Sequence, residues 1–189
     1  MIEAFSNIAT AFGLSTSAGL NAYLPLLLVA VAARYTDLIH LNKPWDVMTS
    51  GWVIGALAVL LLIEMTADKI PAIDTINDGI QTFGRPVAGA ILFAASSGVV
   101  GDLHPALAFI AGLLLAGSVH VVKTAARPMV TATTAGTGNW AVSLIEDVLA
   151  LIGTIMAILA PILVALTVLF GALLGLWWWG HRQSRLAAV

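Results

Sequence analysis

The chain has 189 residues, of which 60% are hydrophobic and only 10% are charged, and its mean hydropathy is +0.99. A soluble domain of this length has about 25% charged residues, because they cover its water-exposed surface. The composition therefore excludes an ordinary soluble protein and predicts one integral-membrane domain over residues 1–189. The net charge of −2 argues against nucleic acid as a partner, and the absence of cysteine excludes a disulfide scaffold and a thiolate metal site.

Five uncharged stretches are candidates for membrane helices, which need about 20 residues to cross a hydrocarbon core. They lie between Glu3 and Arg34 and at 47–63, 86–101, 105–122 and 148–180. The last is too long for one helix, and Pro161 offers a break, so we expect two helices at 141–159 and 162–180, with one kinked helix as the alternative. The expected fold is an all-α polytopic membrane bundle of about six spans.

The basic residues indicate an orientation. With six spans, the side of the amino terminus holds six lysines and arginines in its connecting segments, and the other side holds only Arg34 and Lys43. Because basic loops stay in the cytoplasm, we expect a multi-pass protein of the cell (inner) membrane with both termini cytoplasmic. The lipid bilayer is its expected partner. Small-residue pairs such as Gly112 and Ala116 are expected to pack helices within one chain, and the oligomeric state is not indicated.

Two segments are unusually polar for lipid-facing helices, at 13–25 and 131–140. Each combines small and hydroxyl residues with an asparagine, and the first also contains a proline. Backbone groups that lose their hydrogen bonds at a break in a helix must find a protein or water partner in lipid. Such a break is expected to face the bundle interior or a wet cavity, so these segments are candidate substrate sites. The alternative is a face of small residues that packs against another helix. The candidate residues are Ser15, Thr16, Asn21 and Tyr23 in the first segment and Thr134 and Asn139 in the second.

The similarity between these segments predicts an internal repeat. Residues 16–21 and 134–139 share a pattern that ends in asparagine. In addition, the second and fourth spans both end in ionisable residues and then a proline, Pro71 or Pro128. Secondary transporters are often built from repeats with interrupted helices, and the repeat halves are expected at about 1–101 and 102–189.

Ionisable residues are concentrated toward one side of the predicted bundle, at helical spacing. The connection at 74–85 is expected to form a short amphipathic helix on the inner face. Ionisable residues inside a membrane mark a functional site by default. The alternative is that ion pairs such as Asp68–Lys123 or Glu146–Arg127 only join the ends of helices. The residues are Glu64 and Asp68 on the second span, Asp74, Asp78 and Arg85 in the connection, His120, Lys123 and Arg127 on the fourth span, and Glu146 and Asp147 on the fifth.

Several of these residues belong to motifs that resemble the domain-of-unknown-function 4126 family. The motifs span nearly the whole chain: residues 19–26, Glu64-x-x-Ala67-Asp68-Lys69-Ile70-Pro71-x-x-Asp74, Phe83-x-Arg85-Pro86-x-x-Gly89, Arg127-Pro128 and Ser143-x-x-Glu146-Asp147. The resemblance implies a compact multi-span bacterial membrane protein and no particular activity.

A second motif is similar to one from cation exchangers. Glu64-x-x-x-Asp68-Lys69 is similar to the Glu-x-Gly-Asp-Lys motif of a family of Ca²⁺/Mn²⁺–proton exchangers, with one more residue in the spacing and no glycine. Carboxylates are the ligands that hard divalent cations prefer. A metal ion is therefore expected at Glu64, Asp68, Glu146 and Asp147, and a divalent cation is the one cofactor considered.

The expected function is a small transporter or channel-like carrier with a buried charged site, for a cation or protons. Lys123 or Arg127 would compete with the cation for the carboxylates. One alternative is a protein that binds a lipid or another phosphate ligand through inner-leaflet basic residues, and another is a structural membrane subunit. The chain has no zinc-protease histidine pair, nucleophile elbow or glycine-rich phosphate loop, so an enzyme is not expected.

Overall fold

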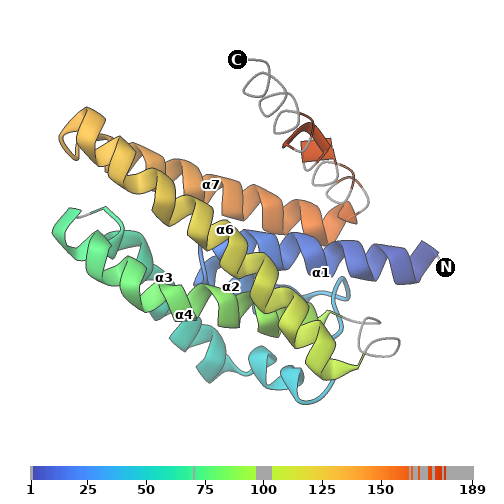
Figure 1. Ribbon diagram of the computed structural model, residues 1–189. Coiled ribbons are helices and arrows are strands. Elements are labelled where there is room, and N and C mark those ends of the chain that lie inside the picture. Colours follow the sequence, from blue (N-terminus) through green and yellow to red (C-terminus); the bar gives the residue numbers. More distant parts are fainter. Residues whose placement is uncertain are drawn as a thin grey trace.

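The regular secondary structure of the described residues is entirely helical, as the all-α prediction requires (Figure 1). The computed structural model describes residues 2–69, 71–96 and 104–161, and the isolated residues 163, 166, 170, 171, 173–175 and 177. Of residues 2, 3 and 71–76 it describes the backbone alone. Most of the expected sixth span, at 162–180, and the carboxyl terminus lie outside the described residues.

The described helices differ in length and hydropathy. In chain order they are α1 (Ile2–Leu20), α2 (Tyr23–Tyr35), the 3-10 helix η1 (Trp45–Thr49), α3 (Gly51–Ala67), α4 (Pro71–Ala95), α6 (Pro105–Thr134) and α7 (Gly138–Leu159). Among them, α6 and α7 are long and apolar enough to cross a membrane, whereas α2 and α3 are apolar but shorter. The break after Leu159 agrees with the predicted division of the last uncharged run, because Ala160 has left the helical conformation.

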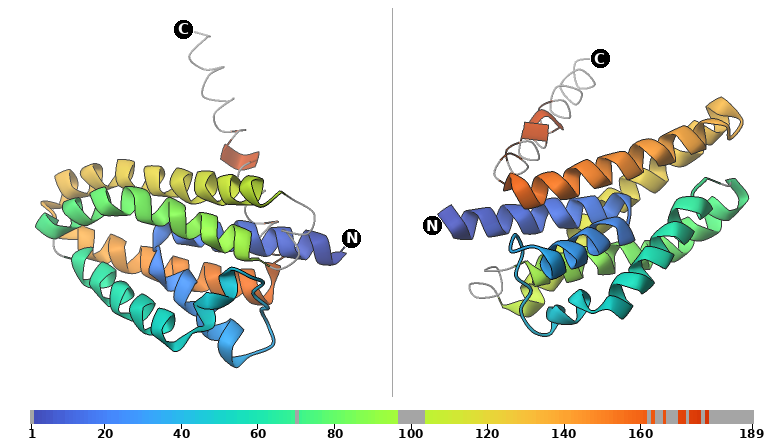
Figure 2. Two further views of the ribbon diagram at one scale, coloured as in Figure 1. Left: turned by 90° about the horizontal axis from the view of Figure 1, so that it is seen from below. Right: turned by 180° about the vertical axis from the view of Figure 1, so that it is seen from behind.

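The first uncharged run forms two helices rather than the one interrupted span that we expected. After the break at residues 21–22, α2 runs back toward the end of the bundle at which α1 begins (Figures 1 and 2). Asn7 on α1, Leu38 after α2 and Ile158 on α7 accordingly line one small cavity. The reversal needs only two residues because Asn21 Oδ1 accepts a hydrogen bond from the Leu24 N–H, which caps the start of α2.

This reversal defines two ends of the bundle. The amino end contains the start of α1, the segment 36–50 and the end of α7, and the turn end contains the turn at 135–137 that joins α6 to α7. Residue 2 and Arg34 therefore lie toward the same end, and the expectation that the first run separates them across a membrane is wrong.

Helix α4 is one continuous helix, whereas we expected a surface helix at 74–85 followed by a separate membrane span. It includes Pro86 in its interior, and it is not a surface helix at 74–85. Its polar residues at spacing four, Asn77, Gln81 and Arg85, are buried, whereas Phe83 is 77% exposed. Proline removes one backbone hydrogen bond, and the buried packing on both sides of Pro86 keeps the helix intact.

Helix α6 likewise continues beyond Pro128 and ends at Thr134, so the prediction that the fourth span stops at this proline is wrong. The residues on its buried face change in character along its length. Small residues, Ala108, Gly112 and Ala116, come first, and the ionisable residues His120, Lys123 and Arg127 follow at the same helical spacing.

Small residues bring α1, α4 and α6 into close contact, as the prediction of packing within one chain requires. A Cβ atom on Gly89 of α4 would collide with the Ala116 side chain of α6 and lie 2.8 Å from the Gly112 carbonyl oxygen. A Cβ atom on Gly19 of α1 would lie 2.6 Å from the Ala116 carbonyl oxygen. In addition, the Ser15 hydroxyl donates to the Gly89 carbonyl at 2.8 Å. The backbones of these three helices are therefore in direct contact.

The Gly89→Ala substitution is expected to lower the free energy of unfolding by about 1–3 kcal/mol, because the added methyl group overpacks the contact with α6. Gly79→Ala in the same helix is the matched control, since a Cβ atom there meets nothing within 4 Å. Thermal unfolding of the purified variants measures both effects. Equal melting temperatures for the two variants would contradict the close contact.

Candidate functional site

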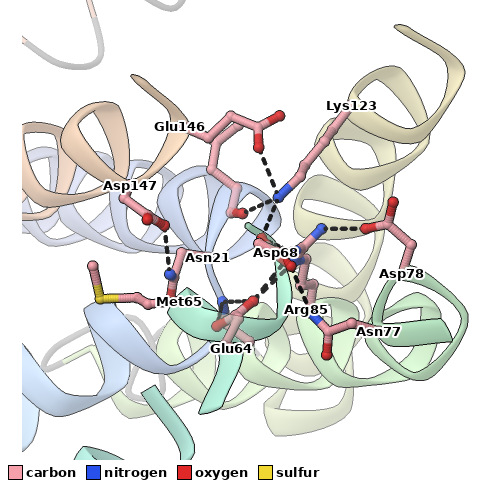
Figure 3. Close-up of polar contacts among 12 residues, drawn as sticks. Asn21, Glu64, Met65, Asp68, Asn77, Asp78, Arg85, Lys123, Glu146 and Asp147 are labelled. Carbon is pink, nitrogen blue, oxygen red and sulfur yellow. Dashed lines mark hydrogen bonds and ion pairs between the residues drawn. The ribbon is translucent and has the colours of Figure 1, made fainter. Parts of the chain in front are cut away.

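Ionisable side chains from four helices meet beside the break between α1 and α2 (Figure 3). Most of them are buried, and they lie on the side of the break that faces the turn end. We call this group the charged cluster. Its members are Glu64, Asp68 and Lys69 from α3 and its end, Asp78 and Arg85 from α4, His120, Lys123 and Arg127 from α6, and Glu146 and Asp147 from α7.

Arg85 lies at the centre of the cluster and is fully buried. Its Nε and Nη2 atoms donate to Glu64 Oε1 at 3.3 and 3.1 Å, and Nη2 also donates to Asp68 Oδ2 at 3.4 Å. Its Nη1 atom donates to Asp78 Oδ1 at 3.5 Å and to His120 Nδ1 at 3.0 Å. A guanidinium group has five N–H donors, and here each of the five has an acceptor.

These contacts determine the protonation of His120. Because Arg85 can only donate, His120 Nδ1 must accept, and the ring is neutral with its hydrogen on Nε2. The Nε2 atom lies 3.3 Å from Thr82 Oγ1, whose own hydrogen is donated to the Asp78 carbonyl oxygen. A protonated His120 would direct a second N–H toward the guanidinium group of Arg85, so His120 stays neutral in this arrangement.

Lys123 and Arg127 connect the carboxylates of α3 and α7. The Lys123 Nζ atom lies 3.3 Å from Asp68 Oδ2 and 3.0 Å from Glu146 Oε2. Arg127 Nη2 lies 2.7 Å from Glu146 Oε2 and 3.7 Å from Asp68 Oδ2. Both pairs that the sequence suggested as helix-joining contacts, Asp68–Lys123 and Glu146–Arg127, are therefore present.

The broken helix contributes backbone groups to the cluster. At the start of α2, the N–H groups of Ala22 and Tyr23 point to Glu64 Oε2 at 3.2 and 3.4 Å. At the end of α1, the Leu20 carbonyl accepts a hydrogen bond from Lys123 Nζ at 3.0 Å. A helix start carries partial positive charge and a helix end partial negative charge. Each end of the break thus meets an ion of the opposite sign.

The Asn21 side chain connects the break to α7, because its Nδ2 atom donates to Asp147 Oδ1 at 3.0 Å. The other carboxylate oxygen of Asp147 lies 3.5 Å from Lys69 Nζ. The break is therefore held by α3, α6 and α7 together.

The structure does not bring every candidate residue into the cluster. Ser15 faces α4, and Thr16 donates to the Phe12 carbonyl of its own helix. Thr134 and Asn139 belong to the α6–α7 turn, where Thr134 Oγ1 accepts from Gly138 N and Asn139 bonds to Thr131. The side chain of Asp74 lies outside the described residues.

The two segments behind the predicted repeat also have different structures. Residues 16–21 end a helix inside the bundle, whereas 134–139 contain the turn at 135–137, in which Ala135 and Gly136 have φ values of 52° and 86°. The internal repeat stays a prediction.

Sequence reasoning missed two polar residues of α4 as site candidates. Asn77 donates to Asp68 Oδ1 at 2.6 Å, and Gln81 is buried on the same face. The successive spacing of four residues from Asn77 to Gln81 to Arg85 was the available signal. It was obscured by the expectation that 74–85 lies on the surface.

The four carboxylates proposed as metal ligands do not converge as a metal site would require. Among the described side chains, no three histidine or carboxylate groups are close enough to hold one ion. Glu64 is held by Arg85 and Glu146 by Lys123 and Arg127. Cations of the protein itself thus fill the positions at which a divalent ion would bind.

Arg85→Lys is expected to destabilise the protein by about 2 kcal/mol or more, because an ammonium group has three donors and leaves buried acceptors unsatisfied. Arg34→Lys is the control, since Arg34 is exposed and its Nη1 donates to the Thr49 carbonyl in the segment before α3. Thermal unfolding of the purified protein checks the prediction. Equal stability of the Arg85→Lys variant and the wild type would contradict the central position of this guanidinium group.

Comparison with known proteins agrees with the motifs. Neither the curated proteins nor the solved structures contain a significant match to the chain. The model of the family described as "Domain of unknown function (DUF4126)" matches residues 8–181, which is most of the chain. The protein is therefore a member of the DUF4126 family.

Proposed function

We propose that this protein is an integral-membrane carrier that exchanges protons for a small monovalent cation at the charged cluster. The observation that carries the proposal is a buried network of opposite charges at a helix break, inside a bundle whose exterior is apolar. Three features support the proposal: the apolar exterior with charged residues inside, the charge balance of the cluster and the oxygen atoms around Lys123.

The distribution of polarity supports a membrane location. Large apolar side chains such as Val122 and Met129 are 70% and 72% exposed, whereas Lys123 and Arg127 on the same helix are each 5% exposed. Water would favour the opposite arrangement, because apolar surface is driven inward and charges outward. A hydrocarbon surrounding accounts for both, since it solvates the apolar exterior and forces ions to pair inside.

The basic residues support an orientation with the turn end in the cytoplasm. Four basic residues, Lys69, Arg85, Lys123 and Arg127, lie on the turn-end side of the helix break, and two, Arg34 and Lys43, lie toward the amino end. By the positive-inside rule, this difference favours an orientation in which the start of α1 lies outside the cytoplasm. This revises the expected position of the amino terminus, while the carboxyl terminus lies outside the described residues.

Single cysteines can test this orientation, because the chain contains none. In intact cells, a membrane-impermeant thiol reagent is expected to label Ser6→Cys and Asn42→Cys and to leave Thr137→Cys unlabelled until the membrane is permeabilised. The physical reason is the reversal at residues 21–22, which brings residues 6 and 42 to one end. Labelling of Thr137→Cys alone would contradict the orientation, and labelling of residue 6 together with residue 137, and not with residue 42, would contradict the reversal.

The charge balance supports proton binding. The described members of the cluster include five carboxylates and four cations, besides the neutral His120, so the cluster has one net negative charge when all five carboxylates are ionised. Uptake of one proton would neutralise it. A protonated carboxyl group also loses its ion pair, and the pairs connect different helices, so proton binding would weaken contacts between helices.

The surroundings of Lys123 support a monovalent cation as the exchanged ion. Its ammonium group lies among three oxygen atoms, from the Leu20 carbonyl and the carboxylates of Asp68 and Glu146. Carbonyl and carboxylate oxygens at a broken helix are the ligands that transporters use for Na⁺ and protons. One monovalent ion carries the same charge as one proton, so either of them neutralises the single net negative charge of the cluster, whereas a divalent ion would leave it with a positive charge.

The cluster offers less support for a phosphate ligand. All four of its cations already lie within 4 Å of a carboxylate, and a phosphate group would have to displace these partners. We therefore do not propose lipid or phosphate binding.

Proteoliposomes that contain a pH-sensitive dye test the exchange. A pulse of NaCl or KCl is expected to change the internal pH in wild-type vesicles, and Glu64→Gln and Glu146→Gln are expected to reduce the initial rate at least tenfold. Asp37→Asn, which removes an exposed carboxylate, is the control and should keep the wild-type rate. A dye response equal to that of protein-free vesicles, with both salts, would overturn the proposal.

A further inference from the structure

A cavity at the amino end lies apart from the charged cluster. It has a volume of about 60 Å³, which is enough for roughly four water molecules at ~15 Å³ each. Its polar lining comes from Asn7 and Thr10 of α1 and from Ser96, and its inner wall includes Leu14 and Ile158. It lies between α1, α2, the end of α4 and α7.

A line of residues on α1 leads from this cavity to the cluster. Asn7, Thr10, Leu14, Ser17 and Asn21 are separated by three or four residues, so they share one helix face. The first three line the cavity, and Asn21 donates to Asp147 of the cluster. This face is therefore continuous from one feature to the other.

Helix α7 provides the opposite wall. Its residues Asp147, Ala150, Thr154 and Ala157 are buried at the same spacing, and Ile158 reaches the cavity. Gly153 adjoins α1, because a Cβ atom at this position would lie only 2.6 Å from Ser17 Oγ. We call the contact between these two helix faces the α1–α7 seam.

The seam separates the cavity from the cluster. At the level of Ser17 and Gly153 the two helices are in direct contact. On the opposite side, the cluster reaches the surface in part: the side chains of Lys69, Asp78 and Glu146 are 28%, 16% and 11% exposed. The cluster is thus accessible from the turn end and closed toward the amino end.

The other face of α1 is unsuited to opening. There, Gly19 and Ser15 contact the backbones of α6 and α4 directly, and any separation would lose this close packing and the hydrogen bond of the buried Ser15 hydroxyl. In the α1–α7 seam, by contrast, the hydroxyl and amide groups of Ser17, Asn21 and Thr154 could bond to water when the helices separate. The contact that fastens the seam, Asn21 to Asp147, also depends on the charge state of the cluster.

We infer that the α1–α7 seam is the gate through which water and small cations pass from the amino-end cavity to Asp147. The inference rests on the proposed exchange function, and it adds a second route by which water and cations reach the charged cluster. In the closed state Ser17 contacts Gly153, and in the open state α7 separates from α1 while α1 stays on α4 and α6.

A disulfide across the seam tests the gate. The Cβ atom of Ser17 lies 3.8 Å from the position of a Cβ atom on Gly153, which is the separation found in disulfides. The double variant Ser17→Cys/Gly153→Cys, oxidised in proteoliposomes, is expected to lose at least nine tenths of the cation-driven pH change and to regain it after reduction. The same vesicles in reduced form are the control. Exchange that proceeds equally in the oxidised and reduced states would overturn the gate and leave the proposed function intact.

Single cysteines provide a readout that does not require exchange. In intact cells a small impermeant thiol reagent is expected to label Ser17→Cys at least tenfold faster than Ser15→Cys, because residue 17 faces the seam and residue 15 faces α4. Equal rates, or no labelling of either variant between pH 5 and 9, would overturn the gate. Labelling of Ser17→Cys without any exchange by the wild type would contradict the proposed function instead.

Discussion

The structure depends on the cost of placing an ion in an apolar surrounding. Each buried ion loses several kcal/mol of hydration, and this loss is offset only when the ion has opposite charges and hydrogen-bond partners around it. Arg85 meets this condition through four side chains from three helices, and Lys123 through two carboxylates and a backbone carbonyl. Because the partners come from different helices, satisfying the charges also determines how the helices are arranged.

The same bundle is held by a different interaction toward the amino end. There the buried faces of α4 and α6 carry glycine and alanine, and the contact is between backbones. Such contacts are stable only at one separation, whereas ion pairs can be rearranged when a proton or another cation binds. The protein therefore combines close backbone contacts among α1, α4 and α6 with ion pairs that connect α4 and α6 to α3 and α7.

The helical class, the charged face of α6 and the break near Asn21 were predictable from the sequence, because each depends on local spacing or composition. The pairs Asp68–Lys123 and Glu146–Arg127 were also predictable, since opposite charges in an apolar chain must meet. The direction of α2 was not predictable, because hydropathy does not distinguish a helix that continues from one that turns back. Pro86 and Pro128 were misleading for a related reason: tertiary packing compensates for the one hydrogen bond that each proline removes.

The reversal at residues 21–22 has a consequence for biogenesis. Its partners are distant in the sequence: Glu64 lies 42 residues after Ala22, Lys123 lies 103 residues after Leu20, and Asp147 lies 126 residues after Asn21. The ribosome synthesises α1 and α2 before these partners, so at that stage the groups at the break lack the contacts that the later helices provide. Helices α1 and α2 therefore reach their full set of native contacts only after α7 has been synthesised.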